Sequence, residues 1–263
     1  MRSRLDASRA VGRLARVQRD GESAPLPAVV AFLPLDQRTR TSPVTATAAL
    51  MAAALIDHPL VVVDVDGTSQ PMRKLLASSG AGDIVGLAAS HDASLWRRSV
   101  EDFVDMSARV PLASCWVDGP GAVPPDALRA ATWKLRRRFP TVFLDVPIGC
   151  PRSTITAATA LASHIVLVAD KHDYQHDWLH TSESVLADAA RRGAVTVAVV
   201  GGGEADRTGC AHDDTVPVPQ LQVAGHSSEG IELPIADTAA LTRCYELTSR
   251  VLRARGSVSP AMS

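Results

Sequence analysis

The strongest constraint on the fold is the regular alternation of short apolar runs with longer helix-forming runs. Six runs rich in Val, Leu and Ile have strand character, with a seventh candidate at 215–218; the six lie at 28–33, 60–65, 112–117, 142–146, 165–169 and 195–200. Short buried strands that alternate with helices are typical of successive βαβ units. The sequence therefore predicts a doubly wound α/β fold, with a mostly parallel sheet of about seven strands and helices on both faces.

The segments between these runs are predicted to be helices. They cover 43–56, 72–78, 95–108, 125–138, 153–163, 177–192 and 237–255. The pair Ser42-Pro43 predicts an N-cap followed by a first-turn proline, and Gly256 follows the last helix where a C-terminus favours glycine.

The length of the chain favours a single domain, and its net charge gives no overall electrostatic attraction for a polyanion. A chain of 263 residues suits a single α/β domain, predicted at 28–256, with a disordered tail at 257–263. Residues 1–27 carry six arginines and form either a basic amphipathic helix for a membrane surface or acidic partner, or a flexible, solvated leader. The formal net charge of −1 predicts no specific nucleic-acid binding.

Cysteine spacing and hydropathy favour a cytoplasmic protein. The four cysteines, Cys115, Cys150, Cys210 and Cys244, form no C-x-x-C pair, so we expect them to be reduced and structural. No apolar run approaches the roughly 20 residues that span a bilayer, and no apolar stretch typical of a signal peptide follows the first arginines.

Three predicted strands end in polar segments that we expect to be neighbours. These segments are 35–42, Asp64-Val65-Asp66-Gly67 and Asp145-Val146-Pro147-Ile148-Gly149. Ligands of open parallel sheets bind outside the carboxyl ends of the strands, near the point where strand order reverses. A strand, a loop and a helix N-terminus are also the usual phosphate site, although 35–42 lacks the glycines that let backbone approach a phosphate.

In this order the three segments resemble the MinD/ParA group of deviant P-loop ATPases. In that group a strand leads into K-G-G-V-G-K-T-T, a second ends in V-D-x-D, and a third precedes D-x-P-x-G. Here Leu35 falls at the signature lysine, and glycines are replaced by Asp36, Gln37 and Thr39. Arg40 stands at the P-loop lysine, and Thr41 and Ser42 stand at the paired threonines.

The resemblance implies a role for each matched residue. The cofactors would be ATP and Mg²⁺, with Thr41 and Asp145 on the metal and Asp66 orienting the attacking water. Asp64 would anchor the turn that carries Asp66. The implied nucleotide contacts are Arg38, Thr39, Arg40, Thr41, Ser42, Asp64 and Pro217.

The departures from the pattern predict that the phosphate cradle is lost. Each non-glycine forced to positive φ costs on the order of 1 kcal/mol, and Asp36 brings a carboxylate toward the phosphate oxygens. Arg40 is bulkier than lysine, and Leu35 removes the lysine through which the group dimerises over ATP. We therefore expect no cofactor and a pseudo-ATPase; the alternative is a weakly active ATPase with an atypical P-loop.

The same resemblance suggests a cellular setting. Glycine-poor versions of the fold resemble accessory proteins of actinobacterial type VII secretion and Tad pilus systems. We therefore expect a cytoplasmic scaffold or regulator with a protein partner, recruited to the inner face of the membrane by that partner or by the basic leader. A homodimer is an alternative.

Local explanations exist for each segment. Asp64 and Asp66 could serve as turn and helix-cap carboxylates, Asp145-Val146-Pro147 could simply be the exit of a strand, and Arg38 and Arg40 could be a solvated pair.

Other polar clusters also have local explanations. His172, His176 and His180 recur at helical spacing and could bind a transition metal or sense pH, although a polar surface or interface is favoured. Gly201-Gly202-Gly203-Glu204 suggests a flexible loop more than a phosphate site, and Leu135-Arg136-Arg137-Arg138 suggests a capped helix C-terminus.

Overall fold

A computed structural model describes residues 28–36, 39–80, 82–91, 99–115, 121–172, 176–202, 214–220 and 230–253. The predicted leader 1–27, the tail 257–263, Gln37, Arg38 and Cys210 lie outside the described residues.

The described strands form one seven-stranded, parallel sheet, which confirms the predicted fold class. Its order is β3-β2-β4-β1-β5-β6-β7. The strands are β1 (Ala28–Pro34), β2 (Leu60–Asp64), β3 (Leu112–Ala113), β4 (Thr141–Asp145), β5 (His164–Asp170), β6 (Val195–Val200) and β7 (Thr215–Val218). The predicted strand at 112–117 is shorter than expected, because β3 ends at Ala113.

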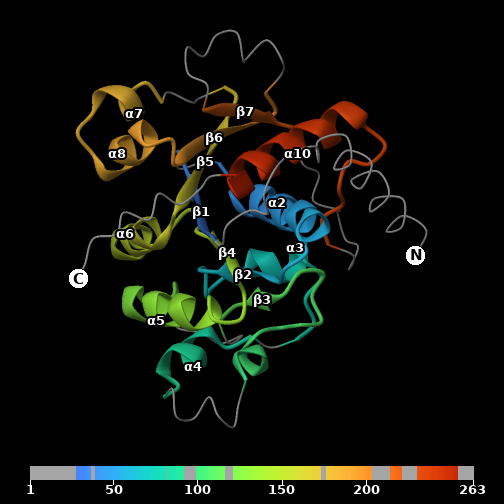
Figure 1. Ribbon diagram of the computed structural model, residues 1–263, viewed down its shortest axis with the longest axis vertical. Helices are drawn as coiled ribbons and strands as arrows, with labels where there is room; N and C mark the ends of the chain where they lie inside the picture. The colour runs from blue at the N-terminus through green and yellow to red at the C-terminus, as the bar shows by residue number, and fades with distance from the viewer. Residues whose placement is uncertain are drawn as a thin grey trace.

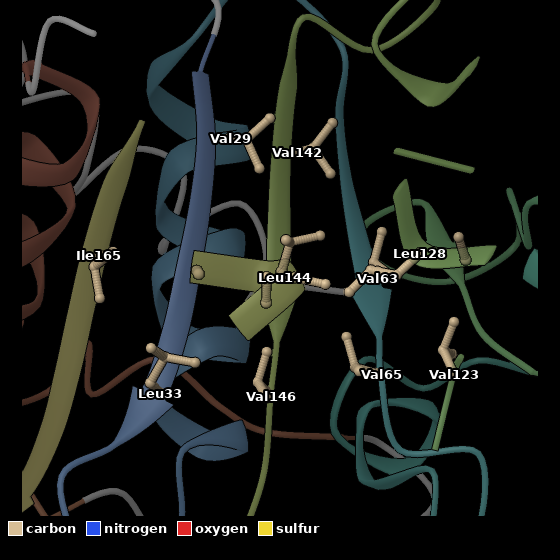
Figure 2. Close-up of a cluster of buried hydrophobic side chains, with 14 of the residues drawn as sticks. Val29, Leu33, Val63, Val65, Val123, Leu128, Val142, Leu144, Val146 and Ile165 are labelled. Carbon is tan, nitrogen blue, oxygen red and sulfur yellow. The ribbon is translucent and has the colours of Figure 1, made fainter. Parts of the chain in front are cut away.

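Alternate residues of each strand enter two separate cores, one on each face of the sheet. Val29, Ala31 and Leu33 pack on one face, and Val30 and Phe32 pack on the other. Figure 2 shows the first core, in which Val142 and Leu144 of β4 lie among side chains of the neighbouring strands.

Helices cover both faces of the sheet (Figure 1). The Phe32 face is covered by α2 (Ser42–Leu55), α3 (Pro71–Leu75) and α10 (Thr238–Arg253). The opposite face is covered by α4 (Ile84–Ala89), α5 (Pro125–Leu135), α6 (Arg152–Leu161), α7 (Trp178–Thr181) and α8 (Val185–Arg191).

One predicted helix is wrong in its described part, and another is divided in two. Within the described part of 95–108, the chain forms only a 3-10 turn, η2 (Val100–Phe103), and Asp105 then pairs antiparallel with Leu112. The predicted helix at 177–192 is divided into α7 and α8, because Ser184 caps a new start by accepting a hydrogen bond from the amide of Ala187 at 3.1 Å.

The short helix α4 was not predicted. It has six residues with Gly86 in its interior, so it carries little helical periodicity. Its start is fixed by Asp83, whose carboxylate accepts a hydrogen bond from the Gly86 amide at 2.7 Å. Across the described residues, no helix is long and apolar enough to cross a membrane.

The strand order places a switch point between β1 and β4. From β1 the chain passes through α2 to β2 on one side, and from β4 it passes through α6 to β5 on the other side. The connections that leave β1 and β4 therefore diverge, and the residues at these carboxyl ends occupy the position where such sheets bind ligands.

Candidate functional site

Two buried carboxylates lie side by side at the switch point, as the sequence predicts for these strand ends. Asp64 ends β2, Asp145 ends β4, and the two are register partners on adjacent parallel strands. Asp145 is also paired with Phe32 of β1. Both aspartates are fully buried, and their strand positions direct them to the face covered by α2 and α3.

Hydroxyl groups of α2 hold the Asp145 carboxylate. Ser42 Oγ donates to Asp145 Oδ2 at 2.7 Å, and Thr45 Oγ1 donates to Oδ1 at 2.6 Å. The prediction that Ser42 is the N-cap of this helix is wrong. The N-cap is Thr41 and makes no side-chain cap bond, because the Ser42 hydroxyl serves the buried carboxylate beneath it.

The Thr41 hydroxyl is the unsatisfied group of the site. Its Oγ1 is buried and makes no hydrogen bond with correct geometry to any described residue. It nevertheless lies near enough to Asp145 to lower the pKa of that carboxyl. A buried hydroxyl without a partner costs about 1–3 kcal/mol, so Thr41 is placed at the expense of stability.

Burial makes the charged form of both carboxyl groups unfavourable. It raises the pKa of Asp145 to about 6, although the hydroxyls of Ser42, Thr45 and Thr41 oppose the rise. Burial, followed by the negative charge of Asp145, raises the pKa of Asp64 well above its usual value. Within the described residues no lysine or arginine pairs with either group, and their hydrogen bonds come from neutral donors.

The local structure after β2 matches the turn-carboxylate interpretation of Asp64 and Asp66. Asp64 accepts the amide hydrogens of Asp66 and Met72, both at 3.0 Å. Asp66 is half-buried and accepts hydrogen bonds from the Thr68 amide at 2.8 Å, the Ser69 amide at 3.2 Å and the Ser69 hydroxyl. These bonds occupy both oxygens of Asp66, and its orientation of an attacking water stays a prediction.

The connection after β1 is closed by its own side chains. Asp36 Oδ1 accepts the Thr39 amide hydrogen at 2.8 Å, and Asp36 Oδ2 accepts the Thr39 hydroxyl at 2.5 Å. Thr39 is buried, whereas Arg40 is exposed. One internal carboxylate therefore accepts hydrogen bonds from both the amide and the hydroxyl of Thr39.

The structure does not bring every expected contact to the site. Pro217 is buried in β7, in register with Val199, and β5 and β6 lie between β7 and β1. Arg38 lies outside the described residues. The proposed nucleotide contacts of both therefore stay predictions.

The three histidines at 172, 176 and 180 do not share one helix. Helix α7 has only four residues, Trp178–Thr181, so His172 and His176 precede it. His176 Nε2 lies 3.4 Å from Thr215 Oγ1, and His180 Nε2 lies 3.5 Å from an oxygen of Asp214. No group of three or more His, Cys, Asp or Glu side chains is placed to hold a metal in the described part of the chain.

Two cysteines border the site and are chemically quiet. Burial, reinforced by the nearby carboxylates, raises the pKa of Cys115 to about 11 and that of Cys150 to about 12. Both thiols are free, as is Cys244. They are protonated at neutral pH, which agrees with the structural role expected for them.

Thr45 is the site residue that sequence reasoning missed. It lies one helical turn after Thr41, so it faces the same side of α2 and reaches Asp145. The four-residue spacing from Thr41 was the available signal. Its meaning depends on β4, because Thr45 has a partner only when the end of β4 places Asp145 beside α2.

Comparisons with known proteins establish the fold. No protein-family model matches the chain, and no curated protein matches it significantly. Among solved structures, it is similar to a chain of the MinC:MinD cell division protein complex from Aquifex aeolicus, with TM-score 0.60, 11% identity, and coverage of 85% of this chain and 95% of that one.

Two further structures agree. The septum site-determining protein MinD from Pyrococcus horikoshii, complexed with Mg-ADP, matches with TM-score 0.56 and 13% identity over 85% of this chain and 95% of its own. A ParA family ATPase from Chlorobium tepidum matches with TM-score 0.52 and 12% identity over 88% and 94%. The chain therefore has the fold of the MinD/ParA P-loop ATPases.

Proposed function

We propose that this chain is a pseudo-ATPase: a MinD/ParA-like protein, with a single domain over 28–256, that acts as scaffold or regulator of a larger assembly. The observation that carries the proposal is the closure of the loop after β1, in which the Asp36 carboxylate binds both the amide and the hydroxyl of Thr39. A bacterial secretion or pilus system is the setting that the sequence resemblance favours.

This closure opposes a phosphate in two ways. A bound phosphate would have to take the Thr39 amide from Asp36, and each such exchange forfeits about 1 kcal/mol of existing hydrogen bonding. The displaced carboxylate would then lie beside an anion of the same sign. Arg40, which stands at the position of the P-loop lysine, is exposed.

The metal side of the site fits its expected ligand better than the phosphate side does. Thr41 offers an unpaired buried hydroxyl, and Asp145 offers a carboxylate that could support a magnesium ion through water. When bound, the ion would supply positive charge beside the phosphates. These two residues are the specific support for the second candidate, a weakly active ATPase with an atypical loop.

Isothermal titration calorimetry with ATP and Mg²⁺ separates the two candidates. We expect no saturable binding at millimolar ATP. Thr41→Ala is the informative variant, and Thr47→Ala is its matched control, since Thr47 is also a buried α2 threonine whose hydroxyl has no partner in the described structure. Micromolar binding that Thr41→Ala and Asp145→Ala abolish, and Thr47→Ala preserves, would contradict the proposal.

Loss of the nucleotide site also predicts that ATP does not change the oligomeric state. Sedimentation velocity with and without Mg-ATP should give the same mass, because a lost nucleotide site cannot couple ATP to dimerisation. A shift from monomer to dimer on adding ATP would favour the ATPase candidate. Recruitment to a membrane, by the partner or by the basic leader, belongs to the same proposal.

A further inference from the structure

The outer face of α5 carries the most exposed aromatic side chain of the described residues. Trp133 is 55% exposed, compared with 37% for Trp178. The opposite side of α5 is fully buried through Leu128, Ala131 and Leu135. The helix lies at the surface between α4 and α6 (Figure 1). Trp133 is therefore held outward by a helix whose other face is fixed in the core.

Arginines surround this tryptophan. Arg129 lies one turn before Trp133, and Arg136 and Arg137 lie one turn after it, all three exposed. The Arg137 guanidinium lies over the Trp133 ring, 5.4 Å from its centroid, in a cation–π arrangement. We call Arg129, Trp133, Arg136 and Arg137 the α5 stripe.

Two surface ion pairs of the described residues lie at or beside the stripe. Asp126 pairs with Arg129 at 2.7 Å, but its side chain is 98% exposed and such a pair is weak. Glu101 pairs with Arg138, which adjoins the stripe. The stripe thus presents three exposed guanidinium groups, and the side-chain contacts of Arg137 with Trp133 and of Arg138 with Glu101 go beyond the helix-capping role first expected.

We infer that the α5 stripe docks an acidic segment of a partner protein. Tryptophan and arginine are the residues most enriched at the centres of protein interfaces, and guanidinium groups bind carboxylates in a planar, bidentate geometry. Trp133 is the apolar anchor, and the three arginines pair with acidic side chains on either side of it. A membrane fits less well, because interfacial helices need a broad apolar face and this stripe carries one large apolar side chain.

The probe for the test is a labelled amphipathic peptide of 18 residues built from Glu, Leu and Ala, with a version in which Gln replaces Glu. Binding to the full chain is followed by fluorescence anisotropy. We expect saturable binding of the Glu peptide, at least tenfold weaker in Trp133→Ala and in Arg136→Glu/Arg137→Glu. Higher salt should weaken it further.

A matched control uses the same residue types elsewhere. Trp178 and Arg191 are an exposed tryptophan and arginine on α7 and α8, so Trp178→Ala/Arg191→Glu should bind the Glu peptide like the wild type. Equal loss in this control, no loss in the α5 variants, or equal binding of the Gln peptide would overturn the inference. So would stripe-dependent binding to phosphatidylglycerol vesicles in place of the peptide.

The inference rests on the proposed role in a larger assembly, but the two can fail separately. Peptide binding at α5 together with tight ATP binding would remove the pseudo-ATPase and leave the docking surface. No peptide binding together with no ATP binding would remove the docking surface and leave the pseudo-ATPase.

Discussion

The loop after β1 and the ends of β2 and β4 lie at the same edge of the sheet, yet they satisfy their polar groups in opposite ways. In the loop, Asp36 and Thr39 complete each other's hydrogen bonds at a half-buried position. At the other two ends, Asp64 and Asp145 are fully buried without a cation among the described residues, and Thr41 above them has an unpaired hydroxyl.

Folding stability explains the polar groups of the loop after β1 but not those at the ends of β2 and β4. A loop that hydrogen-bonds internally helps the fold and needs no ligand. Buried carboxylates with raised pKa values oppose the fold at neutral pH, since the unfolded chain would hold them charged in water. Packing alone does not account for the second region, whereas it accounts well for the first. Substitutions in the two regions should therefore change stability with opposite signs.

The largest expected effect is at Asp145. Asp145→Asn should increase the free energy of unfolding at pH 7 by up to about 3 kcal/mol, because it removes a buried charge whose pKa is raised by roughly two units from 3.8 to about 6. Urea denaturation measures this. Destabilisation at pH 7 that persists at pH 4 would show that the hydrogen bonds from Ser42 and Thr45, not the charge, dominate.

The free energy of unfolding should depend on pH through two buried groups at opposite ends of the sheet, Asp145 and His164, with opposite signs. Asp145 contributes stability below pH 3.8 that is lost as pH rises through about 6. His164, buried at the start of β5, behaves oppositely: burial lowers its pKa from 6.5 to about 4, so acidification across that interval removes about 3 kcal/mol.

These two contributions partly cancel in the wild type and should be exposed by single substitutions. Between pH 7 and pH 4, Asp145→Asn should lose stability more steeply than wild type, and His164→Gln should lose less or gain. Urea midpoints at several pH values measure both slopes. Parallel curves for all three proteins would contradict the assigned protonation.

A smaller effect of opposite sign is expected in the loop. Asp36→Ala should lower the free energy of unfolding by about 1–2 kcal/mol, because the Thr39 amide and hydroxyl lose their acceptor. Asp36→Asn, which keeps one acceptor oxygen, is the control and should lose less. An Asp36→Ala protein as stable as wild type would show that the loop closure is incidental.

The smallest effect concerns the unpaired hydroxyls of α2. Thr41→Val should raise stability by at most about 1 kcal/mol, because a methyl group replaces a buried hydroxyl without a hydrogen-bond partner. Losing the effect of that hydroxyl on the Asp145 carboxylate offsets part of the gain. Thr47→Val, which removes the other such hydroxyl on this helix, should give a similar gain. Loss of stability at Thr41 alone would mean that its hydroxyl has a partner in solution.

Most of the fold could be predicted because it depends on patterns of apolar residues. The strand at 28–34 is continuously apolar, and the aspartates that end β2 and β4 become neighbours once the strands are parallel. The helix at 95–108 was wrong because its apolar spacing is helical while Ser99 and Asp102 close a local turn and Asp105 pairs with Leu112. Local side-chain bonds prevailed there over periodicity.

Only part of the site could be predicted from the sequence. The buried carboxylates follow from their motifs, but the choice of Ser42 between capping its helix and binding Asp145 depends on a residue 103 positions away. The bond between Asp36 and Thr39 is local, yet the resemblance directed attention to missing glycines rather than to what replaced them. When one side chain can make several hydrogen bonds, tertiary contacts decide which bond forms.

Placing glycines at positions 36 and 39 tests directly whether the bond between Asp36 and Thr39 excludes a nucleotide. Wild type and Asp36→Gly/Thr39→Gly are titrated with Mg-ATP under the same conditions, after circular dichroism shows that both are folded. We expect no saturable binding by wild type at millimolar ATP and measurable binding by the double variant, because its loop amides are released. Equal saturable binding by both proteins would contradict it, and absence of binding by both would show that the bond between Asp36 and Thr39 is not what excludes the nucleotide.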